Sequence, residues 1–200
     1  MSIVTLNNRA LKDATAVGTT TGLGNLVFIS RSTASSSSSL SITSGINSTY
    51  KEYIFVFNNI HLSNDSAFFQ FNMSVDTGSN YNVVKTTTYF RAYHAENGSA
   101  TALEYNTTND KAQSSDPQPL IVGLSNDNDI GGSGYLHLFE PSSSVFVKHF
   151  LSHTSASASA YARQDFVAGY GNNTSAVDAV QFTASAGTID SGTIDMYGVS

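Results

Sequence analysis

Alternating apolar and polar residues predict β-strands along most of the chain. The clearest example is residues 69–75 (FQFNMSV), in which Phe, Phe, Met and Val alternate with Gln, Asn and Ser. Successive side chains of a strand point to opposite faces, so this segment forms one apolar and one polar face. Residues 50–61 (YKEYIFVFNNIH) are apolar almost throughout, which favours a strand at the centre of a sheet.

Turn-forming residues separate the predicted strands. The sequence DTGSN at 76–80 is typical of a turn, so we expect residues 81–94 to return antiparallel to strand 69–75. Further strands are predicted at 25–32, 38–44, 120–124, 135–139, 145–153, 162–170, 179–185 and 193–199. About ten or eleven strands without intervening helices predict an all-β fold, an antiparallel β-sandwich that is jelly-roll-like.

The segment 95–119 departs from this regular pattern because it is long, polar and contains two of the three prolines. It forms either a functional excursion or a strand around 102–105. The sequence leaves open whether this segment packs on its own sheet or on that of a partner.

The N-terminal region also differs from the rest. Residues 1–25 are predicted to form an N-terminal arm that reaches to a neighbour, with a short helix at 7–14 and a Gly-rich link at 18–24 (GTTTGLG). A disordered tail is the alternative for this region. Residues 26–200 are predicted to form a single β-sandwich domain.

Composition supports the strand prediction and removes several classes of function. Charged residues make up only 12% of the chain, so Ser, Thr and Asn must supply solubility, and short polar side chains disfavour helix interiors. The net charge is −6 and the nine Lys and Arg residues are scattered, which argues against nucleic acid and an acidic membrane surface as partners. The absence of cysteine excludes disulfides, thiolate metal sites and cysteine nucleophiles.

No targeting or membrane segment is expected. The N-terminus lacks an apolar signal-peptide core, and no stretch approaches the roughly 18 consecutive apolar residues of a membrane span. We therefore expect synthesis in a cytoplasm, without insertion into a membrane.

Two histidines are the first candidates for a metal site. If residues 141–144 form a hairpin turn with Phe139 opposite Val147, then His137 faces His149 across the two strands. A zinc site needs three or four ligands, and no further ligand has matching spacing. Two polar side chains on a solvated or subunit-facing strand are the preferred interpretation, so no metal ligand is assigned.

Asp127 and Asp129 are the best candidates for a cation site. They lie in SNDNDIGG, where alternating Asn and Asp oxygens resemble those of a calcium-binding loop. The Gly and Glu positions of an EF-hand loop do not match. A simple acidic turn is therefore the default, and we expect neither a metal nor any other cofactor.

The sequence offers little for an enzymatic site and more for a carbohydrate-binding one. The GxSxG motif of serine hydrolases is absent, and a glycosidase needs paired carboxylates although only four glutamates are present: Glu52, Glu96, Glu104 and Glu140. We therefore expect no catalytic residue. Sugar binding by aromatic and Asn side chains is the stronger alternative, although Trp is absent; the candidates are residues 89–94 (YFRAYH), Tyr161, Tyr170, Asn172 and Asn173.

The chain resembles a family of small virion structural proteins of tailed phages of marine bacteria. The resemblance is carried by SGINSTYKEYIFVFNNIHLSND at 44–65, FFQFNMSVDTGSNYN at 68–82, FVKHF at 146–150 and AVDAVQFTASAGTIDSGTIDMYGVS at the C-terminal end. It spans about residue 26 to the end and implies a tail-fibre-like or decoration role in the virion. The shared motifs are structural, so the resemblance carries over no catalytic residue.

Together these observations predict a non-enzymatic structural protein of the phage virion surface, made in the host cytoplasm. It is expected to attach to other virion proteins of the head or tail and to self-associate, as a trimer or a higher ring, because sheet edges need covering. A tail-fibre or adhesin component and a capsid decoration component both remain open. The alternative is a carbohydrate-binding module that recognises a host surface glycan.

Overall fold

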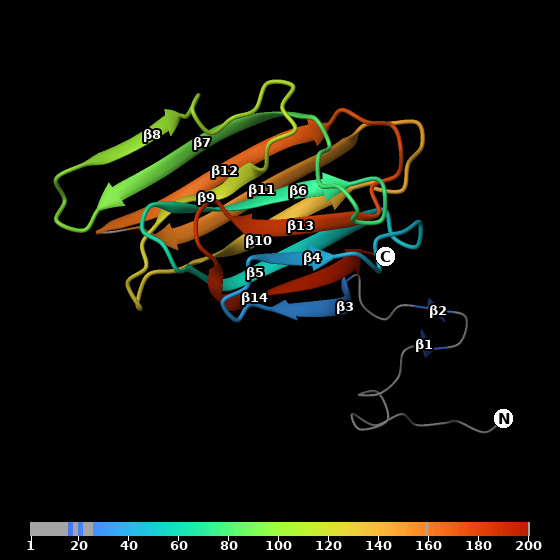
Figure 1. Cartoon of the computed structure of the whole chain (residues 1–200), viewed down its shortest axis with the longest axis horizontal. Coiled ribbons are helices and arrows are strands. Elements are labelled where there is room, and N and C mark those ends of the chain that lie inside the picture. The colour runs from blue at the N-terminus through green and yellow to red at the C-terminus, as the bar shows by residue number, and fades with distance from the viewer. Residues whose placement is uncertain (1–15, 18–19, 22–25, 159, 200) are drawn as a thin grey trace.

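The computed structural model of the 200-residue chain describes residues 16–17, 20–21, 26–158 and 160–199. In this part of the chain the fold is all-β without a helix, and an eight-stranded and a four-stranded antiparallel sheet pack together as a β-sandwich (Figure 1). The predicted helix at 7–14 lies outside the described residues. Two short strands of the predicted arm, β1 (Ala16–Val17) and β2 (Thr20–Thr21), pair with each other.

The large sheet contains the longest strands. In spatial order they are β3 (Leu26–Thr33), β14 (Ile189–Val199), β5 (Glu52–Leu62), β10 (Gly132–Phe139), β11 (Lys148–Ser157), β12 (Tyr161–Gly171), β7 (Lys85–Ala95) and β8 (Thr101–Tyr105). The small sheet has the order β4 (Ser39–Ile42), β13 (Ala179–Ala184), β6 (Ala67–Ser74) and β9 (Gln118–Leu124). Each predicted strand from 25–32 onward corresponds to one of these strands.

The strand order confirms the jelly-roll-like prediction. The order β3-β14-β5-β10 in one sheet and β4-β13-β6-β9 in the other is that of an eight-stranded jelly roll. Two strand pairs are added to this framework: β7 and β8 follow β6, and β11 and β12 follow β10. All four added strands extend the large sheet beyond β10, so that it is wider than the small sheet (Figure 1).

The core consists of rings from the facing sheets. Phe55 and Phe57 of β5 meet Phe182 of β13 with ring centroids 5.7 and 5.3 Å apart, and Phe69 of β6 stacks on Phe182 at 5.6 Å. All four side chains are at most 1% exposed. Stacked and edge-to-face rings of this kind add to the free energy of burial, so this cluster holds the two sheets together.

The long polar segment 95–119 packs on its own large sheet. Its first half forms β8, which confirms the predicted strand, and β8 pairs with β7 at the sheet edge. Its second half returns along β7, where the backbone of Ser114 pairs with that of Lys85. The buried Gln118 side chain then accepts a hydrogen bond from Thr87 Oγ1 at 2.7 Å and donates to the Asn109 carbonyl at 3.0 Å.

One predicted hairpin is wrong. Strand β7 does not return beside β6; it lies in the other sheet, and β6 pairs with β13 and β9 instead. The turn at 76–80 does form, because the Asp76 carboxylate accepts a hydrogen bond from the Asn80 amide at 2.9 Å. Residues 81–84 are then outside any strand, which allows the chain to cross between the sheets. The turn residues are recognisable in the sequence, whereas the sheet that receives the next strand is not.

Candidate functional sites

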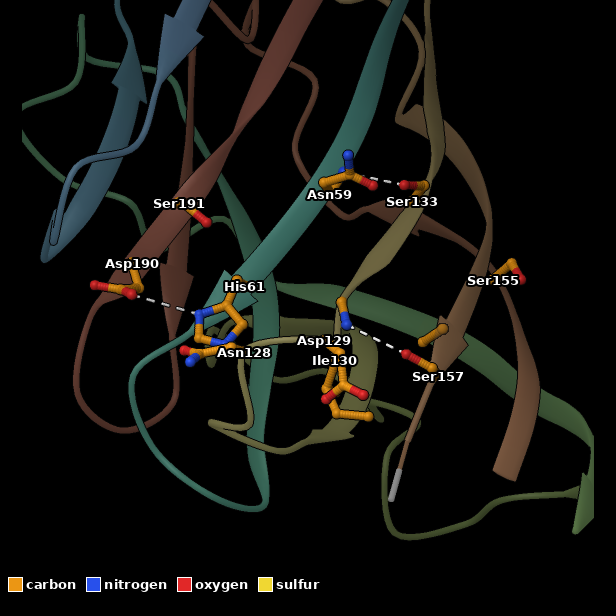
Figure 2. A pocket seen from close by; sticks show the side chains of 12 residues that line it. Asn59, His61, Asn128, Asp129, Ile130, Ser133, Ser155, Ser157, Asp190 and Ser191 are labelled. Carbon is orange, nitrogen blue, oxygen red and sulfur yellow. Dashed lines mark hydrogen bonds and ion pairs between the residues drawn. The ribbon is translucent and has the colours of Figure 1, made fainter. Parts of the chain in front are cut away.

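A polar pocket opens at the end of the large sheet where β5 and β11 finish (Figure 2). Its volume is about 570 Å³. Strand β5 contributes Asn59 and His61, β14 contributes Asp190, and the loop before β10 contributes Asn128 and Asp129. The imidazole of His61 is the only ring among its lining residues, so the pocket lacks the flat apolar surface on which a sugar ring stacks.

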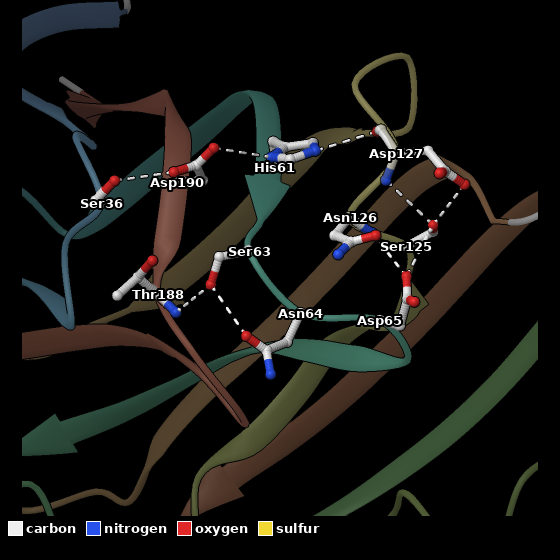
Figure 3. Close-up of polar contacts among 10 residues, drawn as sticks. All are labelled: Ser36, His61, Ser63, Asn64, Asp65, Ser125, Asn126, Asp127, Thr188 and Asp190. Atoms are coloured by element: carbon white, nitrogen blue, oxygen red, sulfur yellow. Dashed lines mark hydrogen bonds and ion pairs between the residues drawn. The ribbon is translucent and has the colours of Figure 1, made fainter.

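His61 is held at both ring nitrogens (Figure 3). Its Nδ1 lies 3.5 Å from Asp190 Oδ2, and its Nε2 lies 3.1 Å from the carbonyl oxygen of Asp127. The Ser36 hydroxyl donates a hydrogen bond to the other oxygen of Asp190 at 2.9 Å. Because both nitrogens have protein partners, this imidazole links β5 to β14 and to the 125–131 loop.

Asp127 and Asp129 have different surroundings. Ser125 Oγ lies 2.8 Å from Asp127 Oδ2 and 3.1 Å from Asp65 Oδ1 (Figure 3). The Asp127 carboxylate therefore bonds within its own loop, to Ser125. Asp129 lines the polar pocket instead (Figure 2). Within the described residues, no group of three or more His, Cys, Asp or Glu side chains is arranged to hold a metal ion.

The outer face of the large sheet carries a row of aromatic side chains, called here the aromatic face. Neighbouring ring centroids lie between 4.2 and 6.0 Å apart, and the closest pair is His153 on Phe166. In order across β10, β11, β12 and β7, the rings are Phe139, His137, Tyr135, His153, Phe166 and Phe90. The small sheet packs on the opposite, inner face, so this row of rings faces outward.

The aromatic face is apolar, partly exposed and almost free of charge. Phe90, Tyr135 and Leu151 are 41, 37 and 39% exposed. Among the outward positions of β5, β10, β11, β12 and β7, the only formally charged residue is Glu52, which bonds to His137. Two shallow apolar hollows of about 430 and 240 Å³ lie beside Leu151 and Ala168. Contiguous exposed apolar surface of this kind is typical of a contact surface.

A third site lies on the inward side of β7 and β12, and we call it the tyrosine–arginine hollow. It has a volume of about 270 Å³ and is lined by Arg91, Tyr93, Ala158, Tyr161 and Arg163. The rings of Tyr93 and Tyr161 meet edge to face with centroids 5.7 Å apart. It opens at the same end of the large sheet as the polar pocket. The last residues of β11, 155–157, line the polar pocket, and the next residue, Ala158, lines the hollow.

Two buried charged residues of β12, Arg163 and Asp165, lie at and next to this hollow. Arg163 is 8% exposed, and its Nε donates a hydrogen bond to Asp165 Oδ2 at 3.2 Å. Burial raises the pKa of Asp165, an effect that the nearby Arg163 opposes. Burial, with the neighbouring Asp165 carboxylate, also raises the pKa of the Tyr89 hydroxyl, which therefore stays protonated.

The predicted histidine pair is not formed. His137 lies opposite Leu151, so the register of β10 and β11 differs by two residues from the prediction. The loop between these strands is longer than predicted, because β11 begins at Lys148 and Val145 and Phe146 lie exposed in the loop. Both histidines still point outward, and His137 pairs with Glu52 of β5.

The predicted sugar-binding residues separate into different regions. Tyr93 and Tyr161 come together, whereas Tyr89 is fully buried. Tyr170 lies at the opposite end of β12, next to His149. The sequence interpretation missed Arg163 and the polar pocket around His61. The signal for Arg163 was its spacing from Asp165, which places two charges on the same face of one strand.

Comparisons of the chain with models of protein families, with curated proteins and with solved structures gave no match. The resemblance to phage virion proteins therefore stays a prediction. No helix in the described residues is long and apolar enough to span a membrane.

Proposed function

We propose that this chain is a non-enzymatic structural protein of the surface of a tailed-phage virion, which self-associates and attaches to other particle proteins. The observation that carries the self-association in this proposal is the aromatic face. It exposes neighbouring apolar rings over four strands with almost no charge. Apolar contact between copies removes this surface from water, and little charge must be desolvated in the process.

The arrangement of the two ends of the sandwich also supports display on a particle. The described sandwich begins at Leu26, the first residue of β3. Leu26 pairs with Val199 at the end of β14, and Val199 also pairs with Glu52 at the start of β5, so these three residues lie at one end of the sandwich. The polar pocket and the tyrosine–arginine hollow lie at the other end, where β5, β7 and β11 finish. Attachment through the N-terminal arm leaves that far end directed away from the particle. Jelly rolls are common in viral capsid proteins, so the fold supports a virion role by analogy.

The first test is to locate and count the protein in purified particles by quantitative mass spectrometry and cryo-EM of the intact virion. Hundreds of copies over the head identify a decoration protein. A few dozen copies or fewer at the tail identify a fibre or adhesin component. Absence from the particle overturns the proposal.

Recognition of a host surface glycan is the second candidate function. It is favoured by the tyrosine–arginine hollow, where two tyrosine rings lie beside two guanidinium groups. Tyr161 is 39% exposed, so part of its ring is accessible to a ligand. The test is binding of the purified full chain to an array of bacterial-type glycans. Saturable binding that is lost in Tyr161→Ala supports this function, and absence of binding to every glycan contradicts it.

A further inference from the structure

The lining of the tyrosine–arginine hollow contains basic residues and no acidic one. The chain has 15 acidic and nine basic residues, yet both charged residues that line the hollow are arginines. No carboxylate is among its lining residues. Each arginine is paired with a carboxylate outside the lining, Arg91 with Glu104 and Arg163 with Asp165. The lining itself therefore offers guanidinium donors to a ligand and no competing carboxylate, which favours a ligand with acceptor oxygens.

Arg163 has unused hydrogen-bonding capacity. Its side chain is nine-tenths buried, and among the described residues its one protein acceptor is Asp165, to which Nε donates at 3.2 Å. Within the described part of the chain, Nη2 is buried without a hydrogen-bond partner. A buried donor without a partner loses its hydration and gains nothing in return, and the loss is greater when the group is charged. A ligand oxygen that accepts from the part of this guanidinium that lines the hollow gives the group an acceptor in addition to Asp165.

Arg91 has a different role, because two of its donors share one carboxylate oxygen and its guanidinium lies beside a tyrosine ring. Its Nε and Nη2 lie 2.7 and 2.6 Å from Glu104 Oε1 on the neighbouring strand β8. Its Cζ lies 5.5 Å from the centroid of the Tyr93 ring, so the pair also fixes that ring in place. Arg163 is also paired, with Asp165, but within the described residues it keeps a donor without a partner, so it is the group that a ligand contacts, and Arg91 positions the tyrosine beside it.

The two tyrosines give the hollow an apolar wall. Tyr93 and Tyr161 lie edge to face at 84°, which presents ring surface to the hollow from two directions. The C–H groups on one side of a pyranose ring pack against such a surface, whose electron-rich face attracts them. A flat apolar wall next to a guanidinium suits a ring that carries a carboxylate.

We propose that the tyrosine–arginine hollow binds a carboxylated sugar unit, with the ring against Tyr161 and Tyr93 and the carboxylate on Arg163. This inference rests on the second function proposed above and names its ligand class. A planar guanidinium binds a carboxylate through charge-assisted hydrogen bonds, which are about twice as strong as neutral ones. A neutral sugar offers only uncharged acceptors to the same group.

The test compares each acidic sugar with its neutral methyl ester. Titration calorimetry of the full chain uses oligosaccharides of galacturonate, glucuronate and N-acetylneuraminate, together with the methyl ester of each. We expect at least one acid to bind, with its ester weaker by at least about tenfold, as expected for loss of one charge-assisted hydrogen bond. Tyr161→Ala weakens binding of that acid by a similar factor. Tyr135→Ala, an equally exposed tyrosine on the aromatic face, leaves the affinity unchanged.

The outcomes separate this inference from the function on which it rests. Equal affinity for acid and ester, or binding of neutral array glycans alone, overturns the carboxylate inference and leaves glycan recognition standing. Absence of binding to every acid, ester and array glycan overturns both. Loss of acid binding in Tyr135→Ala with no loss in Tyr161→Ala places the binding site on the aromatic face and not in the hollow, which also contradicts the inference.

Discussion

At the scale of single residues, two buried lysines hold loops to the large sheet. Lys85 is fully buried, and its Nζ donates a hydrogen bond to the Asp116 carbonyl at 2.7 Å. Lys148 is also fully buried and donates to the Phe146 carbonyl at 2.7 Å. Burial lowers the pKa of Lys85 to about 8, helped by the positive charge of Lys111 and opposed by Asp116. These lysines are satisfied by carbonyl oxygens, and their charge is stabilised less well than in water.

Lys85 makes stability depend on pH in the alkaline range. Between its folded pKa of about 8 and its unfolded value of 10.5, the unfolded chain binds more protons than the folded protein. Its contribution to the free energy of unfolding therefore rises with pH, by about 2 kcal/mol between pH 7.5 and 9.5. Urea denaturation at both pH values measures this rise, and Lys85→Met removes it. The same rise in the variant contradicts the assignment.

Phe182 is expected to be the most sensitive core position. Its ring contacts Phe55, Phe57 and Phe69, and it is fully buried. Phe182→Ala leaves a cavity among these rings and lowers the free energy of unfolding by about 3–5 kcal/mol in a denaturant titration. Phe28→Ala is the matched control, since Phe28 is 54% exposed, and it costs less than about 1 kcal/mol. Similar losses in both variants disagree with the packing described.

Some candidate residues were predictable from the sequence and others were not. Tyr93 and Tyr161 were candidates because aromatic residues in strands are recognisable locally. Arg163 was missed because a charged side chain on the inward face of a strand is rare, and burial depends on which strand lies opposite. Here β9 lies opposite, and Gly123 lies against the Arg163 guanidinium.

At the scale of elements, local pattern predicted the strands but not all of their partners. The alternation at 69–75 identifies β6 because the period of two is a property of one strand. The partners of β6 are β13 and β9, which lie far from it in sequence, and no local signal indicates them. The histidine register failed for a related reason, since one loop of unforeseen length moved every pair along β10 and β11 by two residues.

Gln118 is expected to hold the 106–117 segment against β7. Its amide links Thr87 to the carbonyls of Asn109 and Pro119, and it is fully buried. Gln118→Leu leaves these groups without partners, at a cost of about 1–3 kcal/mol. Hydrogen exchange measures the effect as faster exchange of the Lys111 and Ser114 amides, which bond to β7.

The control for this prediction is a glutamine on the other side of the sheet. Gln164 is exposed on the outer face of β12, so Gln164→Leu leaves exchange at these two amides unchanged. Unchanged exchange in Gln118→Leu shows that the segment is held by other contacts.

At the scale of the whole molecule, the two faces of the large sheet differ in character. Its inner face carries the core and buried charges at both ends, Lys85 and Lys148 at one end and Arg163 with Asp165 nearer the other. Its outer face carries the aromatic row. The added strands β11, β12 and β7 carry half of the rings of that row, so the widening of the jelly roll extends the surface proposed for self-association well beyond β10.

Self-association is expected to depend on the centre of the aromatic face. Leu151 lies between the two apolar hollows and is 39% exposed. In Leu151→Glu a charge must be desolvated when copies meet, so the association constant falls by at least about tenfold in sedimentation velocity. Val145→Glu is the matched control, because Val145 is 70% exposed in a loop outside this face. An unchanged association constant for Leu151→Glu, or an assembly lost only in the control, excludes this face as the contact.

The position of β14 has a consequence for how the protein is made. β14 is inserted between β3 and β5 and bonds to both, yet it leaves the ribosome after every other strand of the sandwich. Until then, nascent β3 and β5 each have an unpaired edge towards the missing strand, which a neighbouring chain can occupy. Chains translated side by side on one messenger therefore have an opportunity to exchange β14 before release. In a protein that works as an assembly, subunits already linked in this way would leave the ribosome together.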